Sequence, residues 1–341
     1  MVGQRSASRH ALGETGMNYP IAVVIPSYRV KAHILEVISR IGPEVSRIYV
    51  VDDACPEESG RFVEQHCMDP RVQVLRHTDN QGVGGAVKTG YRQALHQGAH
   101  IVVKVDGDGQ MDPRLIPIFI KPLLDGRADY TKGNRFYDLE HIQRMPSMRL
   151  FGNAVLSLVA KLSTGYWNLF DVTNGYTAIH GKVLRHLPLE KVSNRYFFET
   201  DMLFRLNTIR AVAMDIPMDA VYGNETSSLE IGSILLEFGG KHLKNVCKRV
   251  FYNYFLRDMT AASLELLTGS CLLAFGVIFG ALHWIQALVT GTPTPTGTIM
   301  LAALPALVGL QLLLAFVSFD VANVPRQPIH ADLPSWRSPA E

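Results

Sequence analysis

Two aspartates separated by a single glycine directly follow an apolar run of the chain. The segment Asp106-Gly107-Asp108-Gly109-Gln110 comes after IVVKV, residues 101–105. Carboxylates this close repel each other unless a cation neutralises them. Mg²⁺ and Mn²⁺ take oxygen ligands, often few from the protein and the rest from substrate phosphates. The pattern therefore predicts a site for a divalent metal ion, Mg²⁺ or Mn²⁺.

Three more segments with turn residues or carboxylates follow apolar runs in the same way. They are Pro26-Ser27-Tyr28, Asp52-Asp53 and the stretch from Asn80 to Gly90. A carboxylate at such a position can instead cap the next helix. For Asp52, Asp53 or Asp112 taken alone, both interpretations stay open.

The stretch GVGGAVKTG, residues 82–90, resembles two nucleotide-binding signatures without matching either. A Walker loop needs glycine immediately before Lys88, where this chain has Val87. The dinucleotide fingerprint would need its third glycine at the same position. The remaining interpretation is a glycine-rich helix start that packs close to a neighbouring strand.

The elements around these segments alternate between short β-branched runs and amphipathic stretches. The predicted strands are 21–27, 47–53, 72–77 and 100–108, and the predicted helices between them are 30–41, 59–67 and 84–97. This alternation predicts an α/β fold with a mostly parallel sheet and helices on both faces. Ligands of such sheets bind at the carboxyl ends of the strands, where the aspartates lie.

Two uncharged apolar runs occupy the last third of the chain, at 266–289 and 297–319. Each would be about 35 Å long as a helix, enough to cross a hydrocarbon core of about 30 Å. We expect a hairpin of two transmembrane helices. The alternative is a pair of buried helices in a soluble core, although such helices rarely exceed about 14 residues.

Basic residues flank this hairpin on one side. Lys241, Lys244, Lys248 and Arg249 precede the first run, whereas the linker GTPTPT is uncharged. The positive-inside rule therefore predicts an integral membrane protein with the bulk of the chain on the cytoplasmic side. The N-terminal residues are too polar for a signal peptide. The formal net charge of +2 gives no reason to expect nucleic acid as a partner.

The pattern as a whole resembles glycosyltransferase family 2, whose catalytic domain has the GT-A fold. Within the family it is most similar to the polyprenyl-phosphate glycosyltransferases, the group of dolichol-phosphate mannosyltransferase, which also fit the two-helix anchor. The resemblance covers about residues 20–220 and rests on IPSYRV, VVDDACPE, NQGVGGAVKTGY, VDGDGQMDP, KGNRF, DVTNGYTAI and RYFFETD, in the order of the family.

The resemblance implies roles for the residues near the predicted strand ends. Asp52 or Asp53 would contact the nucleoside of a nucleotide-sugar, and Asp106 its ribose or sugar. Asp108 and Gln110 would hold the metal ion. Lys88 is expected at the pocket edge or in solvent. The remaining residues implied to line or shape the nucleotide site are Pro26, Tyr28, Asn80 and Gly82.

The resemblance also implies an acceptor site. Arg135 would meet a phosphate, unless it forms a surface ion pair with Asp138 or Glu140. Arg149 or Arg144 would receive the acceptor phosphate. Asp201, in the acidic element Glu199-Thr200-Asp201, would position the acceptor or act as a base.

One departure from the family leaves that base open. Some bacterial relatives carry aspartate where this chain has Tyr176, after Gly175. An alternative for the acidic element is a pair of acids on the first turn of a helix.

The implied reaction is metal-dependent inverting transfer of a sugar from a nucleotide-sugar to a polyprenyl phosphate in the lipid bilayer. A UDP-sugar is the favoured donor and GDP-mannose a possible one. Two alternatives are a non-processive transferase that uses a glycolipid or another membrane alcohol, and an inactive membrane scaffold. Some relatives form tetramers, so a homo-oligomer is possible.

The expected domain organisation follows from these segments. It comprises a flexible N-terminus (1–18), a GT-A catalytic domain (19–227), an amphipathic juxtamembrane helix (228–258), two transmembrane helices (259–321) and a flexible tail (322–341). For the juxtamembrane segment, a helix packed against the catalytic domain is the alternative to a helix lying in the membrane interface.

Overall fold

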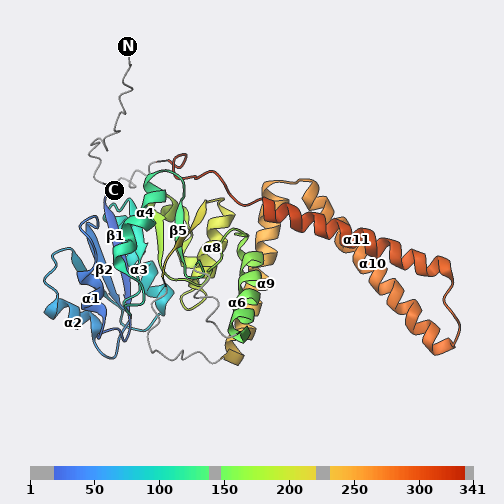
Figure 1. Cartoon of the computed structure of the whole chain (residues 1–341), viewed down its shortest axis with the longest axis horizontal. Coiled ribbons are helices and arrows are strands. Elements are labelled where there is room, and N and C mark those ends of the chain that lie inside the picture. Colours follow the sequence, from blue (N-terminus) through green and yellow to red (C-terminus); the bar gives the residue numbers. More distant parts are fainter. Residues whose placement is uncertain (1–18, 138–146, 220–230, 335–341) are drawn as a thin grey trace, which may run out of the picture.

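The computed structural model describes residues 19–137, 147–219 and 231–334. Its centre is a mixed seven-stranded sheet with the strand order β3-β2-β1-β4-β6-β5-β7. Helices cover both faces of the sheet, and two long helices extend away from it (Figure 1). The predicted α/β class with an appended helical hairpin is confirmed.

The strands are β1 (Ile21–Ser27), β2 (Arg47–Asp52), β3 (Val72–Arg76), β4 (Ile101–Lys104), β5 (Tyr130–Asn134), β6 (Thr177–His180) and β7 (Ala213–Pro217). The helices of this domain are α1 (Ile34–Ser39), α2 (Ser59–His66), α3 (Val83–His96), α4 (Ile116–Leu124), α6 (Ser147–Thr164), α7 (Gly181–His186) and α8 (Phe198–Thr208), with 3₁₀ turns at Pro113–Leu115 and Leu189–Lys191.

The sheet is parallel except around β6. Strands β1 to β4 pair in parallel, and β6 runs antiparallel to both β4 and β5. Strands β1, β4 and β6 are almost wholly buried, as expected for a sheet covered on both faces. Strand β4 ends at Lys104, four residues before the predicted end, so Asp106 and Asp108 lie in the loop that follows it.

The glycine-rich stretch starts helix α3, as the sequence indicates. Gly82 is the N-cap residue with φ of 86°, a conformation that favours glycine. A Cβ atom at Gly90 would lie 2.3 Å from Cγ1 of Val24 in β1, and one at Gly84 would lie 2.4 Å from the carbonyl oxygen of Ser193. The small residues therefore allow α3 to pack directly against the sheet and against the chain segment before α8.

Lys88 differs from the sequence expectation. It is only 6% exposed, and its ammonium group donates to the carbonyl oxygen of Val192 at 2.9 Å and to the side chain of Asn194. The lysine lies on the face of α3 that packs against residues 192–194 rather than at the pocket edge. Its role in the structure is to satisfy buried carbonyl groups of that segment.

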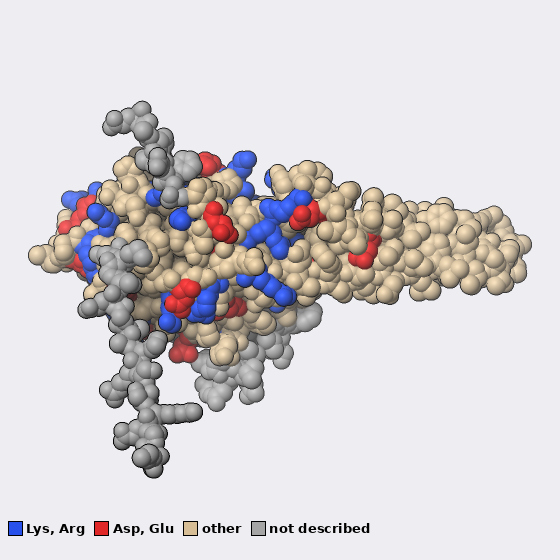
Figure 2. All heavy atoms as spheres, turned by 90° about the horizontal axis from the view of Figure 1, so that it is seen from above, with Lys and Arg blue, Asp and Glu red and all other residues tan. Residues whose placement is uncertain are grey.

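The C-terminal hairpin consists of α10 (Ala261–Thr290) and α11 (Thr296–Ala322). The most apolar windows of the two helices have mean hydropathies of 2.0 and 2.3, and only 6% and 11% of those windows is buried. Such exposed apolar helices do not behave as core helices of a soluble domain. Figure 2 shows the outer part of the hairpin without Lys, Arg, Asp or Glu, while charged residues gather on the catalytic domain and at the hairpin base.

Small residues bring the two hairpin helices into backbone contact. A Cβ atom at Gly276 would lie 2.6 Å from the backbone nitrogen of Ala306, and one at Gly309 would lie 2.5 Å from that of Leu273. Close approach at glycine is typical of helix pairs in membranes, where van der Waals packing supplies much of the association energy. Contacts between α10 and α11 themselves therefore hold the hairpin together.

Helix α9 (Ile231–Phe251) and the π-helix Tyr252–Arg257 connect the catalytic domain to the hairpin. Helix α9 packs against α6 and α8 and buries His242, Asn245 and Arg249. The side chains of Leu243 and Lys244 face outward. This is the packed amphipathic helix that the sequence left as an alternative, with an outer face that mixes apolar and basic residues.

The described part of the tail, residues 323–334, contains no helix or strand and lies along the catalytic domain (Figure 1). The carboxylate of Asp129 accepts hydrogen bonds from the backbone nitrogens of Ile329 and His330, each at 2.9 Å. Ile329 and Leu333 pack against the core. The expected flexibility of the tail therefore does not extend to this segment, because the buried Asp129 carboxylate holds it.

The contact between α3 and β1 generates a stability prediction. Gly90→Ala is expected to lower the free energy of unfolding by about 1–3 kcal/mol, because the added methyl group overpacks against Val24. Thermal unfolding of the detergent-solubilised chain measures the change. The matched control is Gly152→Ala on the exposed side of α6, where a Cβ meets nothing within 4 Å and a gain of up to about 1 kcal/mol is expected. Equal melting temperatures for wild type and Gly90→Ala would contradict the prediction.

Candidate active site

A cleft of about 820 Å³ opens at the carboxyl ends of β1, β2 and β4. It contains most of the residues that the sequence assigned to nucleotide-sugar binding. Asp52 and Gln110 do not line it, whereas Arg195 and Tyr196, which the sequence did not single out, do. The predicted residues that line the cleft are Pro26, Tyr28, Asp53, Asn80, Gly82, Asp106 and Asp108.

Asp53 organises one wall of the cleft. Its buried carboxylate accepts hydrogen bonds from the backbone nitrogens of Gln81 at 2.8 Å and Gly82 at 2.7 Å. It also lies 2.7 Å from Nδ1 of His77, whose Nε2 contacts the hydroxyl of Thr89 at 2.9 Å. Asp53 thus ties the end of β2 to the first turn of α3, which gives the loop at 80–82 a fixed shape.

The neighbouring Asp52 has a different environment. Its carboxylate accepts hydrogen bonds from the backbone nitrogens of Cys55 at 2.8 Å and Gly60 at 2.6 Å. These contacts hold the turn before α2 and leave the side chain buried outside the cleft. Of the two aspartates between which the sequence could not choose, Asp53 is the one at the cleft.

A buried lysine lies beneath the cleft. Lys104 is 1% exposed, and its Nζ lies 2.8 Å from Oδ1 of Asp106 and 3.3 Å from Oε1 of Glu199. Burial alone would lower the pKa of Lys104, but the two carboxylates raise it above its usual value. Lys104 is therefore a permanent positive charge between two acids. A Cβ at Gly175 would lie 2.4 Å from this Nζ and 2.7 Å from Oδ2 of Asp106, so any larger residue there would displace the ion pair.

Asp201 does not join this cluster. Its buried carboxylate accepts hydrogen bonds from the backbone nitrogen of Ser193 at 2.9 Å and from the Ser193 hydroxyl at 3.3 Å, and it lies 3.5 Å from Arg205. Residues two apart on a helix point about 200° away from each other. Since Glu199 faces Lys104, Asp201 must face away. Glu199 is the acid of this element that the structure brings close to Asp106.

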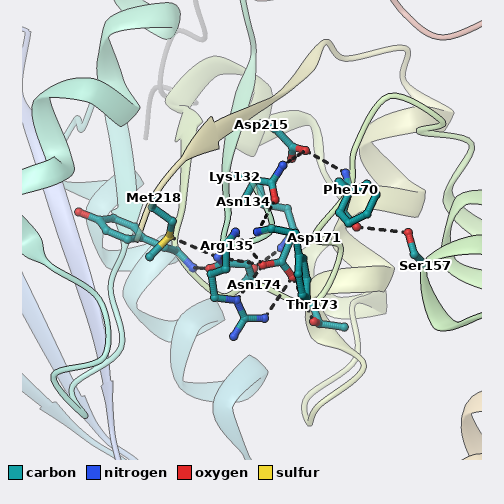
Figure 3. Close-up of polar contacts among 12 residues, drawn as sticks. Lys132, Asn134, Arg135, Ser157, Phe170, Asp171, Thr173, Asn174, Asp215 and Met218 are labelled. Carbon is teal, nitrogen blue, oxygen red and sulfur yellow. Dashed lines mark hydrogen bonds and ion pairs between the residues drawn. The ribbon is translucent and has the colours of Figure 1, made fainter. Parts of the chain in front are cut away.

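Arg135 forms an ion pair that the sequence did not predict (Figure 3). Its guanidinium contacts both carboxylate oxygens of Asp171, at 2.7 and 3.1 Å. Burial alone would raise the pKa of Asp171, but the hydrogen bonds and charge of Arg135 lower it below the usual range. Arg135 remains 33% exposed. The proposed partners Asp138 and Glu140, and Arg144, lie outside the described residues.

Two further ionisable side chains lie near this pair (Figure 3). The ammonium group of Lys132 donates to the carbonyl oxygen of Asn174, and burial lowers the pKa of Lys132 to about 8. Burial raises the pKa of Asp215 to about 6, while its carboxylate accepts hydrogen bonds from Phe170 at 2.8 Å and Asn134 at 3.2 Å. Composition gave no signal for either, because their environment depends on long-range packing of β5 and β7.

The cleft residues fit a divalent cation that takes most of its ligands from substrate. Among the described residues, no group of three or more His, Cys, Asp or Glu side chains is arranged to hold a metal ion. Asp106 and Asp108 nevertheless both reach the cleft, and one or two carboxylates plus phosphate oxygens is a usual Mg²⁺ environment. Oδ1 of Asp108 accepts a hydrogen bond from the backbone nitrogen of Gln110 at 2.9 Å, which fixes the loop. Arg149 lies in the first turn of α6.

Comparison with known proteins identifies relatives of this domain. The chain is 29% identical over 221 residues to undecaprenyl-phosphate mannosyltransferase of Micrococcus luteus, covering 64% of this chain and 90% of the relative. It is 26% identical over 216 residues to UDP-N-acetylglucosamine–dolichyl-phosphate N-acetylglucosaminyltransferase of Methanococcus voltae, covering 59% of this chain and 86% of the relative.

A solved structure with the same fold is glucosyl-3-phosphoglycerate synthase from Mycobacterium tuberculosis in complex with UDP. It superposes with a TM-score of 0.52 at 19% identity and covers 70% of this chain and 87% of that structure, which supports the GT-A type of fold. Residues 22–187 match the sequence profile of glycosyl transferase family 2, a span that runs from β1 through α7. The catalytic domain therefore belongs to glycosyltransferase family 2, and the protein is a glycosyltransferase.

Proposed function

We propose that the protein transfers a sugar from a nucleotide-sugar, with a UDP-sugar favoured over GDP-mannose, to a polyprenyl phosphate in a membrane. The observation that carries this proposal is the attachment of an acidic cleft to an exposed apolar helical hairpin in one chain. The names of the two sequence relatives, which both specify a polyprenyl-type phosphate, support the acceptor class.

The donor is proposed to lie in the cleft with its nucleoside against the wall built by Asp53. The loop at 80–82 supplies a fixed backbone edge, and Pro26 and Tyr28 supply apolar surface. The ring of Tyr28 is exposed at the cleft, so it is available to stack on a base. Asp106 would contact the ribose or sugar.

The diphosphate of the donor is proposed to face Asp108, with Gln110 beside it. A divalent cation held there, Mg²⁺ or Mn²⁺, would stabilise the negative charge that develops on the leaving nucleoside diphosphate. Asp106 and Lys104 then fix the floor of the site through the 2.8 Å ion pair. The rigid floor keeps the anomeric carbon aligned for inverting attack from the opposite face.

The acceptor phosphate is proposed to approach from the side of Glu199 and Arg135. A phosphate monoester is largely dianionic at pH 7, so attack by its oxygen needs little help from a base. The planar guanidinium of Arg135 suits a phosphate, and Asp171 holds the group in place. Arg149 could add a second positive charge. Since the carboxylate of Asp201 is committed to Ser193, Glu199 is the better candidate to orient the acceptor.

A membrane-embedded acceptor explains the apolar surface near the hairpin base. Helix α6 exposes Val155, Leu158 and Leu162, which share one face of the helix, and Phe170 lies exposed after it. A surface of this kind at the base of a transmembrane hairpin suits the headgroup region of a bilayer. The basic residues flanking the hairpin favour the cytoplasmic side for the catalytic domain.

An acceptor alcohol from a glycolipid is the second candidate for this site. A hydroxyl group needs a general base, whereas a phosphate does not. Glu199 would then have to serve as the base, because of its place beside Asp106. An inactive scaffold of the same fold remains the third candidate and would bind donor without turnover.

A transfer assay tests the proposal. Radiolabelled UDP- and GDP-sugars are offered with polyprenyl phosphate in detergent, with Mg²⁺ or Mn²⁺ and with EDTA. We expect metal-dependent label in the lipid and a loss of about 10²-fold or more in Asp108→Ala. Asp125→Ala, at the exposed end of α4, is the control with unchanged activity. Label in a lipid alcohol but not in the phosphate would move the proposal to the second candidate, and no label with any acceptor would reject it.

The two neighbouring aspartates give a separate test of the donor site. Asp53→Ala is expected to weaken nucleotide binding by about 1–3 kcal/mol, because Gln81 and Gly82 lose a charged hydrogen-bond acceptor and the cleft wall loosens. Asp52→Ala is expected to lower the melting temperature while the folded protein keeps its affinity. Isothermal titration with UDP measures the affinity of both variants, and thermal unfolding measures their melting temperatures. A larger loss of affinity in Asp52→Ala than in Asp53→Ala would contradict the assignment.

A further inference from the structure

One carboxylate near the end of α11 is buried among donors of the catalytic domain and of the segment that connects this domain to the hairpin. Asp320 in α11 is 5% exposed. Its carboxylate contacts Nη1 and Nη2 of Arg249 at 2.6 and 3.0 Å, the hydroxyl of Tyr254 at 2.5 Å and Nε1 of Trp167 at 2.8 Å. We call these four residues the junction cluster. The side chains of Arg249, Tyr254 and Trp167 all donate to the carboxylate of Asp320.

The donors of the junction cluster come from three separate elements. Arg249 belongs to α9, Tyr254 to the π-helix, and Trp167 to the loop after α6. The chain makes room for the guanidinium, since Gly165 has φ of 77° and a Cβ there would lie 2.9 Å from Cδ of Arg249. Nε of Arg249 donates to the carbonyl oxygen of Leu162 at 3.1 Å. The position of Arg249 is therefore also fixed by contacts outside the hairpin.

The hairpin is also held on both sides of the cluster. Before α10, Asn253 donates to the side chain of Asn207 in α8 at 2.9 Å. After α11, Arg210 donates to the carbonyl oxygen of Asn323 at 2.8 Å and to its side chain at 3.0 Å. A bidentate arginine pair is directional, so it resists rotation as well as separation. The hairpin is therefore tied to the catalytic domain by directional contacts before α10, near the end of α11 and directly after it.

We infer that the junction cluster is a rigid joint that sets the height and tilt of the cleft above the bilayer. The inference rests on the proposed function, because it gives the joint its purpose. A phosphate on a membrane-embedded lipid is confined to a narrow depth. If the joint is loosened, the catalytic domain adopts many orientations relative to the membrane, and only a few of them bring the cleft to that depth. An acceptor dissolved in water can reach the cleft in every orientation of the domain. Arg249 and Asp320 are positioning residues, since neither lines the cleft.

The kinetic test compares two acceptors of the same chemistry. One is long-chain polyprenyl phosphate in nanodiscs, and the other is a short-chain, water-soluble prenyl phosphate. Asp320→Asn is expected to lower kcat/KM for the embedded acceptor by about tenfold or more and for the soluble one by no more than about twofold. Arg249→Lys keeps the charge but loses the fork geometry and should act in the same direction. Asp258→Asn, an exposed carboxylate beside the π-helix, is the matched control without effect.

Two kinetic results would overturn the inference. An equal loss with both acceptors would mean that the cluster supports only the fold. Unchanged rates with both would mean that the joint does not limit access to the lipid.

A distance measurement tests the joint without turnover. Spin labels are attached at Arg127, exposed after α4, and at Leu267, exposed on α10, after replacement of the accessible cysteines by serine. In nanodiscs we expect one narrow distance distribution for wild type and Asp258→Asn and a broad one for Asp320→Asn and Arg249→Lys. Equally narrow distributions in all four would mean that the junction cluster is not what makes the joint rigid, and a broad distribution for wild type would mean that the joint is not rigid. If wild type glycosylates neither acceptor, the proposed function fails, while the distances still decide whether the joint is rigid.

Discussion

The positive charge of Lys104 holds together the two halves of the catalytic domain. The lysine ends β4, where the first half of the chain delivers Asp106, and it reaches Glu199 from α8 in the second half. A buried ammonium group without partners would be costly, so the two acids stabilise the charged form of Lys104 at the end of the strand. The site floor is therefore an electrostatic contact between halves that are distant in sequence.

The same requirement separates structural acids from functional ones. A buried carboxylate needs donors, and Asp52 and Asp201 take theirs from nearby backbone and hydroxyl groups in turns outside the cleft. Asp53 also uses backbone donors, but these donors belong to the loop that walls the cleft. Asp106 is paired with a buried lysine at the floor. The position of the donors, more than the aspartate itself, decides what each acid can do.

Much of this could be predicted from local sequence pattern. Strands β1 to β3 and the start of α3 follow from apolar runs and glycines, because those signals are encoded within a few residues. Which of Glu199 and Asp201 faces the cluster around Lys104 could not be predicted, since this depends on the rotation of α8 about its axis. The burial of Lys88 depends on a segment about 100 residues further along the chain. The pairing of Arg135 with Asp171 is a long-range contact of the same kind.

The hairpin imposes a last constraint on the catalytic domain. An enzyme dissolved in water can meet its substrate from any direction, but a domain fixed to a membrane meets lipid headgroups at only one height. Van der Waals packing between α10 and α11 can set the shape of the hairpin, but it does not fix the position of the cleft relative to the hairpin. Directional contacts at the base of the hairpin have to fix that position. The buried ion pair between Arg249 and Asp320 supplies such contacts where the two parts of the chain meet.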